Sequence, residues 1–400
     1  MTISSTTEGP LSGVRVIDVS TVLAGPFACQ LLGDLGADVI KVEHPRLGDP
    51  MRHMGAELSG QGLWFKVLSR NKRSVGLDLH APAAAEAFLR LAETADVIVE
   101  NFRPGTLERW GVGYDAIHAR NARTILVSIT GFGQSGPYAE RPAFGTLAEA
   151  MSGVATIAKT AEGKPVLPIF GLADSVAGMA AAIAAVSALY HVKGTKADGQ
   201  HIDMTLVEPL LTLIGAQPTI YSALGSLPVR GSTSALRDLY LTKDNRWVAI
   251  SATTLESATR VMHVIGRQDL TASDWFATGV TRAEHDAVLA PLISDWIKSR
   301  PRDEVIAAFV THKAAIAPVY EIDDILTDEH FVQRGVVTAV DDPELGLIQM
   351  QSPIFRMPAT PTSIRHSGRT LGADTDEVLI GELGYTSQEV ADMRAIKAIA

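Results

Sequence analysis

The first third of the chain alternates short apolar, β-branched runs with longer segments whose apolar residues recur at helical spacing. Residues 14–19 (Val-Arg-Val-Ile-Asp-Val) predict a strand, and the apolar positions from Phe27 to Leu35 predict the helix after it. The same alternation continues at residues 37–42, 82–94, 96–100 and 124–129. Strands that alternate with helices predict an α/β fold with an open, mostly parallel sheet.

Further along the chain the pattern changes. Helical spacing predicts three more helices, at residues 146–151, 175–192 and 204–213. From about Leu224 the composition becomes rich in Gly, Ser, Pro and Arg, which indicates a linker. Two apolar runs around the turn 243–246 then predict a β-hairpin, followed by charged helices. We expect a large domain in residues 1–223, a small domain in 224–325 and a return segment in 326–400.

Composition and charge narrow the class of protein. A chain of 400 residues with 46% hydrophobic content favours two domains, and a net charge of −10 argues against nucleic acid as a partner. Cys29 is the single cysteine, which excludes an internal disulfide and a cysteine-clustered metal site. The N-terminus has no signal-like pattern, and the Ala-rich stretch 176–192 is too short for a membrane span. We expect a cytoplasmic protein without a membrane partner.

One glycine pattern suggests a dinucleotide site and is set aside. Residues 131–136 fit GxGxxG and follow a predicted strand, but Pro137 and Pro142 leave no helix N-terminus directly behind the glycines. A nicotinamide cofactor is therefore disfavoured. Walker A, GxSxG and HExxH patterns are absent, which argues against ATP-driven ligation, serine hydrolysis and zinc chemistry.

Asp174 lies directly before the Ala-rich helix, where an aspartate is most often an N-cap. A helix N-terminus would also keep a partly buried carboxylate ionised and able to attack a thioester, so both interpretations can hold. Four cations, Lys72, Arg73, Arg103 and Arg109, lie near ends of predicted strands. Each alone is typical of a solvated surface, but together in an acidic chain they predict a phosphate pocket.

The ordered motifs of the chain resemble the family III coenzyme A transferases, the CaiB/BaiF family. They stand at residues 11–18, 24–26, 35–43, 71–74, 100–105, 131–133, 171–178, 199–200 and 383–385. The resemblance implies a Rossmann-like large domain built from both ends of the chain, with an α+β domain inserted between them. It also implies an interlocked homodimer.

Formyl-CoA transferase is the relative from which site residues are transferred. The resemblance implies that Asp174 is the covalent nucleophile, with the CoA diphosphate near Arg109 and Arg46 as a local candidate to help. The implied CoA contacts are Leu23, Ala24, His44, Leu77, His80, Asn101, Phe102, Arg103 and Arg109. Leu23 stands where that relative has a Gln, and Phe144–Gly145 where it has a Tyr–Glu pair, so oxalate and formate are not expected as substrates. His44 and His80 replace residues that are basic there.

The implied reaction passes CoA from an acyl-CoA to a small organic acid through an aspartyl anhydride and an aspartyl–CoA thioester. It needs no tightly bound cofactor, ATP or metal. Arg230 and Arg237 are candidates to meet a distal carboxylate. One alternative is an α-methylacyl-CoA racemase, but Phe144 and Gly145 replace the His–Asp pair that racemases carry. The other is a non-catalytic acyl-CoA-binding protein, against which Asp174 argues.

Overall fold

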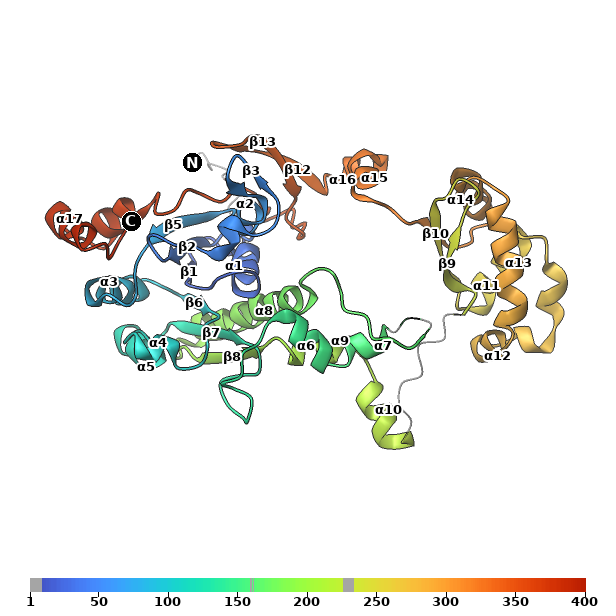
Figure 1. The fold of residues 1–400 in the computed structure, drawn as a ribbon, viewed down its shortest axis with the longest axis horizontal. Coiled ribbons are helices and arrows are strands. Elements are labelled where there is room, and N and C mark those ends of the chain that lie inside the picture. The colour runs from blue at the N-terminus through green and yellow to red at the C-terminus, as the bar shows by residue number, and fades with distance from the viewer. Residues whose placement is uncertain (1–8, 159, 161, 226–233) are drawn as a thin grey trace. The chain divides into compact units, whose positions relative to one another are not determined.

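The computed structural model describes residues 9–158, 160, 162–225 and 234–400 (Figure 1). By its internal contacts the chain divides into two units. The larger unit combines residues 1–225 with 335–400, and the smaller unit comprises residues 226–334. The sequence places the corresponding boundaries after residues 223 and 325.

The larger unit is built on a six-stranded parallel sheet with the order β5-β2-β1-β6-β7-β8. The strands are β1 (Arg15–Asp18), β2 (Asp38–Glu43), β5 (Lys72–Gly76), β6 (Val97–Glu100), β7 (Ile125–Thr130) and β8 (His201–Thr205). The first strand is central, and the order of succession reverses between β1 and β6, as in doubly wound nucleotide-binding folds. The predicted parallel α/β fold is confirmed.

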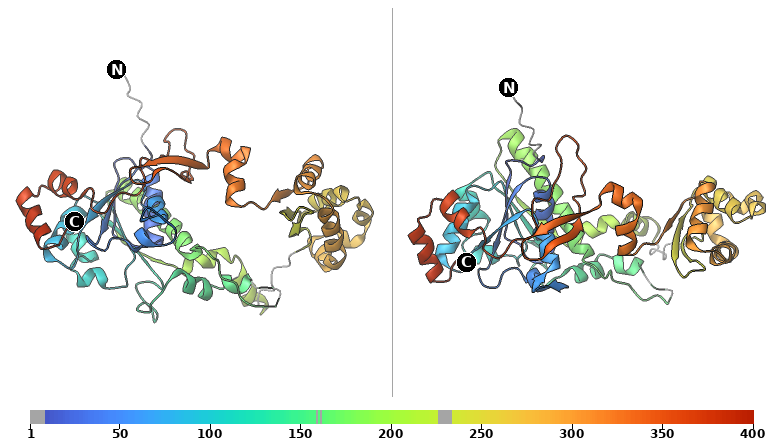
Figure 2. Two further views of the ribbon diagram at one scale, coloured as in Figure 1. Left: turned by 45° about the horizontal axis from the view of Figure 1, so that its top comes forward. Right: turned by 90° about the horizontal axis from the view of Figure 1, so that it is seen from above.

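Helices cover both faces of this sheet. Helices α1 (Ala24–Asp34) and α8 (Leu172–Thr195) lie side by side on one face, and α3 (Pro82–Ala92), α5 (Tyr114–Arg120) and α17 (Ser387–Ala395) pack on the other (Figures 1 and 2). Successive strand residues point to opposite faces. Val16 therefore belongs to the first core and Ile17 to the second. Burial of both faces explains why the strands are continuous apolar runs.

Helix α8 has the length and composition of a membrane span, alone among the helices that the structure describes. Its small residues Ala177, Ala181 and Ala185 are buried in the core against α1. Gly178 allows the closest approach, because an added Cβ would lie 2.7 Å from the Ala24 carbonyl oxygen. The predicted buried helix is confirmed, and its N-terminal end is held close to the start of α1.

The two edge strands were not predicted. Strand β5 begins with Lys72 and Arg73, so its sequence lacks an apolar strand pattern. The predicted helix over 204–213 is wrong in its first part, because β8 ends at Thr205 and α9 begins only at Glu208. Edge strands depend on partners elsewhere in the chain, which local periodicity does not report.

The return segment completes the larger unit at the β5 edge. The Ser74 N–H donates to the Asp374 carboxylate (2.7 Å), and the Gly76 N–H donates to the Thr375 hydroxyl (3.1 Å). The buried Lys66 ammonium pairs with Asp342 at 2.9 Å. Residues from both sides of the smaller unit therefore share one core.

The smaller unit joins the predicted hairpin of β9 (Arg237–Leu241) and β10 (Trp247–Ser251) to a third strand, β11 (Ile316–Pro318). Its helices bury Phe276, Ile293 and Phe309 against that sheet.

The other described strands of the chain are β3 (Glu57–Leu58), β4 (Gln61–Gly62), β12 (Val337–Asp342) and β13 (Gly346–Gln351). The remaining helices are α2 (Leu63–Leu68), α4 (Thr106–Arg109), α6 (Gly145–Met151), α7 (Val154–Ile157), α9 (Glu208–Leu213), α10 (Gln217–Leu224), α11 (Leu255–Val264), α12 (Gly279–Glu284), α13 (Asp286–Lys298), α14 (Arg302–Thr311), α15 (Ile322–Thr327) and α16 (Glu329–Arg334), with short turns of helix at η1 (Pro50–His53), η2 (Gln268–Ala272), η3 (Asp274–Phe276) and η4 (Glu377–Glu382).

Candidate active site

The loops after β1 and β6 meet where the order of the strands reverses, which is where open α/β sheets bind ligands. Asn101, directly after β6, joins the two loops. Its carboxamide oxygen accepts the Thr21 N–H (2.8 Å), and its amide nitrogen donates to the Thr21 carbonyl (2.7 Å). Asn101 is thus a structural bridge between the two loops as well as a predicted CoA contact.

The loop after β1 also holds a strained residue. Val22 has φ 65°, a left-handed conformation that a β-branched residue rarely adopts. Its N–H donates to Asp49 (3.1 Å), which is buried and pairs with the Lys41 ammonium at 2.8 Å. That ammonium also donates to the Ser20 carbonyl (3.0 Å). Buried charges therefore fix the entry to α1.

A cavity of about 560 Å³ opens beside these loops. Five of the predicted residues line it: Ala24, Asn101, Phe102, Arg103 and Asp174. Among the residues that the structure describes, its charged lining is Arg103, Arg141, Glu149 and Asp174, and an apolar wall comes from Phe144, Ile169 and Phe170. Two carboxylic side chains and two arginines thus line one space that is large enough for a small acyl group.

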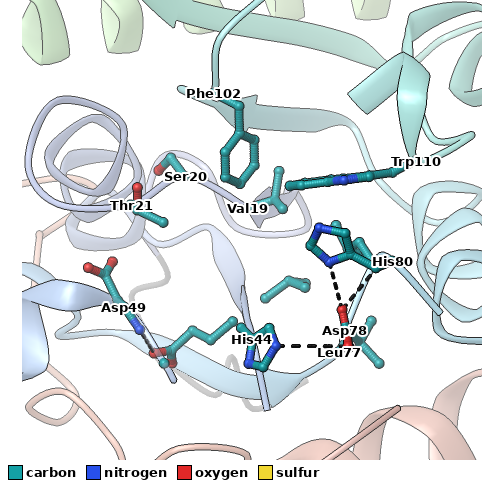
Figure 3. Close-up of a pocket in the computed structure, with 14 residues that line it drawn as sticks. Val19, Ser20, Thr21, His44, Asp49, Leu77, Asp78, His80, Phe102 and Trp110 are labelled. Carbon is teal, nitrogen blue, oxygen red and sulfur yellow. Dashed lines mark hydrogen bonds and ion pairs between the residues drawn. The ribbon is translucent and has the colours of Figure 1, made fainter. Parts of the chain in front are cut away.

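A smaller cavity of about 110 Å³ adjoins it, because Thr21 and Phe102 line both. Four of the predicted residues line it: His44, Leu77, His80 and Phe102. Figure 3 shows Phe102, Trp110 and His80 together on one side of this pocket. The ring centroid of Trp110 lies 5.0 Å from that of Phe102 and 4.8 Å from that of His80. Trp110 was missed, because an isolated Trp in a sequence carries no signal of a site.

Asp78 orients the two histidines of the smaller cavity. Its carboxylate lies 2.9 Å from His80 Nδ1 and 3.8 Å from His44 Nε2 (Figure 3). Burial opposes ionisation, but the hydrogen bonds from His80 and the nearby imidazoles hold the pKa of Asp78 below its ordinary value.

Two of the four cations proposed for a phosphate pocket are structural, and the prediction is wrong for them. Lys72 and Arg73 begin β5, so they lie at the end of the parallel sheet opposite to the ligand crevice. Lys72 is buried and pairs with Asp18 at 2.7 Å, and Arg73 pairs with Asp38 at 2.7 Å. Arg103 and Arg109 follow β6 and are exposed.

Asp174 is not the N-cap of α8. The helix begins at Leu172 with Gly171 as its N-cap, and Asp174 lies in the first turn. Burial, followed by the negative charge of Glu149, raises the pKa of Asp174 from 3.8 to about 6. Burial therefore outweighs the stabilising effect of the helix N-terminus on the charged form of Asp174. The carboxylate is still mostly ionised at neutral pH.

Helix α6 contributes Glu149, which the sequence does not single out, and Gly145, whose closeness to Asp174 is visible only in the structure. Glu149 is buried, and its Oε1 accepts the N–H of Ala173 (3.2 Å) in the first turn of α8. Gly145 lies so close to the nucleophile that an added Cβ would overlap the Asp174 carboxylate. A glycine at the start of α6 is therefore required for the observed position of Asp174.

Comparisons with known proteins decide the family. A family model described as CoA-transferase family III matches residues 11–375. The chain belongs to CoA-transferase family III. It is 36% identical over 395 residues to the succinyl-CoA–D-citramalate CoA-transferase of Chloroflexus aurantiacus, covering 98% of each chain. It is 37% identical over 403 residues to the succinyl-CoA–L-malate CoA-transferase beta subunit of that organism, covering 99% of each.

The fold agrees with solved structures. A CAIB/BAIF family protein from Brucella suis superposes with a TM-score of 0.83 at 29% identity, over 94% of this chain and 100% of that chain. The predicted family and the transfer of CoA between an acyl-CoA and an acid are confirmed. The GxGxxG segment at residues 131–136 is not followed directly by a helix, as expected from the sequence. The next helix, α6, begins only at Gly145.

Three residues that the family III resemblance assigns to CoA line neither cavity. Leu23 packs against the cluster of Met51, Phe65 and Leu68. Arg46 is exposed in the turn after β2, where its N–H donates to His44 Nδ1 (3.2 Å). Arg109 is exposed at the end of α4, where its guanidinium donates to the Thr106 hydroxyl (2.8 Å). Both arginines lie on the surface beside the loops that form the cavities.

Proposed function

We propose that this protein passes CoA from a dicarboxylic acyl-CoA, such as succinyl-CoA, to a second small carboxylic acid, with Asp174 as the covalent nucleophile. The observation that carries the proposal is the position of Asp174 in the wall of a 560 Å³ cavity at the strand-order reversal. The two Chloroflexus relatives, named for succinyl-CoA with citramalate or malate, support the choice of substrates.

The chemistry follows from an ionised carboxylate beside a thioester. An Asp174 oxygen attacks the thioester carbonyl carbon and the C–S bond breaks. CoA departs as the thiolate, and the acyl group is left bound to Asp174 as a mixed anhydride. The thiolate then attacks the aspartyl carbonyl carbon, which releases the donor acid and forms an aspartyl–CoA thioester. The acceptor carboxylate repeats the two exchanges in reverse order, and Asp174 is regenerated. The energy of the thioester is retained, so neither ATP nor a metal enters these steps.

The two adjoining cavities and the exposed arginines beside them suit the two ends of an acyl-CoA. Arg103 and Arg109, on the loop after β6 and on α4, are available for the CoA phosphates, since guanidinium groups pair with phosphate oxygens. Phe102 and Trp110 offer aromatic surface to the apolar parts of the ligand. Asp174 then meets the thioester in the larger cavity.

A second carboxylate on the substrate needs a cation in the same cavity. Arg237 lies on β9 of the smaller unit, and Arg230 lies outside the described residues. Arg141 lines the cavity of Asp174, and its guanidinium lies 3.6 Å from the Tyr138 ring centroid. It forms no ion pair with any residue in the described ranges. We propose that Arg141 binds the distal carboxylate in place of the two arginines suggested by the sequence.

We also propose an interlocked homodimer in the cytoplasm, without a tightly bound cofactor. Large apolar side chains on α8 and α10 support an interface, because Ile183 is 69% exposed and Tyr221 is 56% exposed. The buried, free Cys29 supports a reducing compartment. Light scattering at several protein concentrations tests the dimer, and a monomer at all of them would refute it.

Trapping of the intermediate tests the nucleophile. Incubation with succinyl-CoA alone should leave an adduct on Asp174 that hydroxylamine cleaves, located by peptide mass spectrometry. Asp174→Asn should trap nothing and lose most of the activity while it remains folded. An adduct on another residue, or full activity of the Asn variant, contradicts the proposal.

The racemase alternative predicts a different exchange. Racemisation in D2O must place deuterium at the α-carbon, whereas CoA transfer touches only the carbonyl carbon. Phe144 and Gly145 supply neither a proton donor nor an acceptor beside Asp174. We expect CoA transfer to acids without α-deuteration of a 2-methylacyl-CoA. Deuterium uptake without transfer to any acid tested would favour the racemase.

A further inference from the structure

Glu149 is the second carboxylate in the cavity of Asp174, and the steps above give it no role. It is buried on α6, where its side chain lines the cavity wall. Its Oε1 accepts the Ala173 N–H at 3.2 Å, one residue before Asp174. No cation among the residues that the structure describes pairs with Glu149, and a buried carboxylate without such a partner is costly, so its presence in this cavity calls for a reason.

We propose that Glu149 is a positioning residue for Asp174: it fixes the first turn of α8 through Ala173 and places a second negative charge beside the nucleophile, which makes that nucleophile more reactive. This inference rests on the proposed function. The two carboxylates belong to different helices, and α6 brings them together because Gly145 leaves room for the Asp174 side chain. The arrangement therefore depends on the fold and on two residues of the short helix α6, Gly145 and Glu149.

The charge of Glu149 acts on the basicity of the Asp174 carboxylate. A neighbouring negative charge disfavours a second one, so Asp174 holds its proton to a higher pH, in agreement with its pKa of about 6. A more basic nucleophile of one type attacks faster once it is ionised, with slopes of about 0.4–0.5 known for thiolates. At such a slope, an increase of one unit in the pKa of the nucleophile raises its rate of attack about threefold once it is ionised. The accompanying loss is of activity below about pH 6, where the Asp174 carboxyl is mostly protonated.

Other charged residues line the same cavity as Glu149 and Asp174. Among the described residues they are Arg103 on the loop after β6 and Arg141 on the loop before α6. The pKa of Asp174 is nevertheless raised, by its burial and by the charge of Glu149. Neither arginine bonds to Glu149 or Asp174 in the hydrogen bonds and ion pairs formed by the residues of known placement. The Glu149 charge is therefore the one negative neighbour on the described cavity wall.

The experiment compares Glu149→Gln with the wild type. The Gln oxygen keeps an acceptor for the Ala173 N–H but removes the charge, so thermal stability should change little. We expect the acid limb of the acylation rate to move to lower pH, and the rate at pH 8 to fall by about threefold for each pH unit of that movement. Glu140→Gln, which neutralises an exposed acid on the loop before α6, is the matched control and should leave both quantities unchanged.

A second readout does not depend on any substrate. Infrared difference spectra against the matching Asp174→Asn forms report protonation of the Asp174 carboxyl, and its midpoint should be lower in Glu149→Gln. If that variant fails to fold, Glu149→Asp, which retracts the charge by one methylene, should lower the midpoint less. An unchanged midpoint overturns the inference. If no donor acylates the wild type, the proposed function fails, while the infrared titration still decides the role of Glu149.

Discussion

Replacement of Asp174 by Asn should make the stability of the protein less dependent on pH, even though it abolishes the nucleophile. In the folded protein the pKa of this carboxyl is raised to about 6, whereas in the unfolded chain it returns to about 3.8. Between these values the folded state binds more protons than the unfolded state, so the free energy of unfolding falls as pH rises. Below about pH 3 the cost vanishes, and above about pH 7 it is complete.

The size of the effect follows from the same two values. At 1.36 kcal/mol for each pH unit, the difference corresponds to about 3 kcal/mol. The carboxylate is only partly buried, and solvent screening reduces this figure, so we expect about 2 kcal/mol. Asp174→Asn carries no such cost, because an amide does not ionise. Its stability relative to the wild type should therefore rise by about 2 kcal/mol between about pH 3 and pH 8.

Urea denaturation followed by circular dichroism at several pH values measures this difference. Asp115→Asn is the matched control, because Asp115 is an exposed aspartate in the first turn of α5. The control should not reproduce the pH-dependent difference. A constant offset between Asp174→Asn and the wild type, or a difference that shrinks as pH rises, would refute the assignment of a raised pKa to Asp174.

Three further substitutions test the geometry of the site. Gly145→Ala should lower kcat at least tenfold with KM for the donor nearly unchanged, because the added methyl displaces the nucleophile, whereas Gly194→Ala, in open space on α8, should change neither. Arg109→Ala should raise KM for several acyl-CoAs by a similar factor, and an unchanged KM with every donor would remove this residue from the site. Asn101→Ala should cost about 1–3 kcal/mol of stability and raise KM, since both bonds to Thr21 are lost; wild-type thermal melting would contradict this.

The central sheet could be predicted from the sequence because its strands are buried on both faces. Val16, Val39 and Val97 lie in adjacent strands, in apolar runs that identify them without tertiary information. Strand β5 was missed because its charged residues are neutralised by partners remote in sequence, such as Asp18 for Lys72. Its acceptors lie some 300 residues away, as the bond from Ser74 to Asp374 shows. No local pattern carries that information.

Some residues of the candidate site could be predicted from the sequence, and others could not. Asp174 and the loop 101–103 stand in motifs shared with the family, so a resemblance points to them. Glu149 and Trp110 stand in no such motif and become visible only where the fold brings them to the cavities. The raised pKa of Asp174 could not be predicted, because a helix N-terminus can be inferred from sequence but the burial of a carboxyl beside Glu149 cannot.

The pairing of the N-terminal strands with the return segment has a consequence for biosynthesis. While the ribosome is still translating the smaller unit, Lys66 lacks its partner Asp342, and the β5 edge lacks Asp374. The nascent chain then exposes unpaired strand-edge N–H groups and an uncompensated cation, features that favour aggregation. The smaller unit, whose residues are contiguous, has all its partners much sooner. Synthesis therefore completes the inserted unit first, while the sheet that carries the nucleophile waits for the return segment.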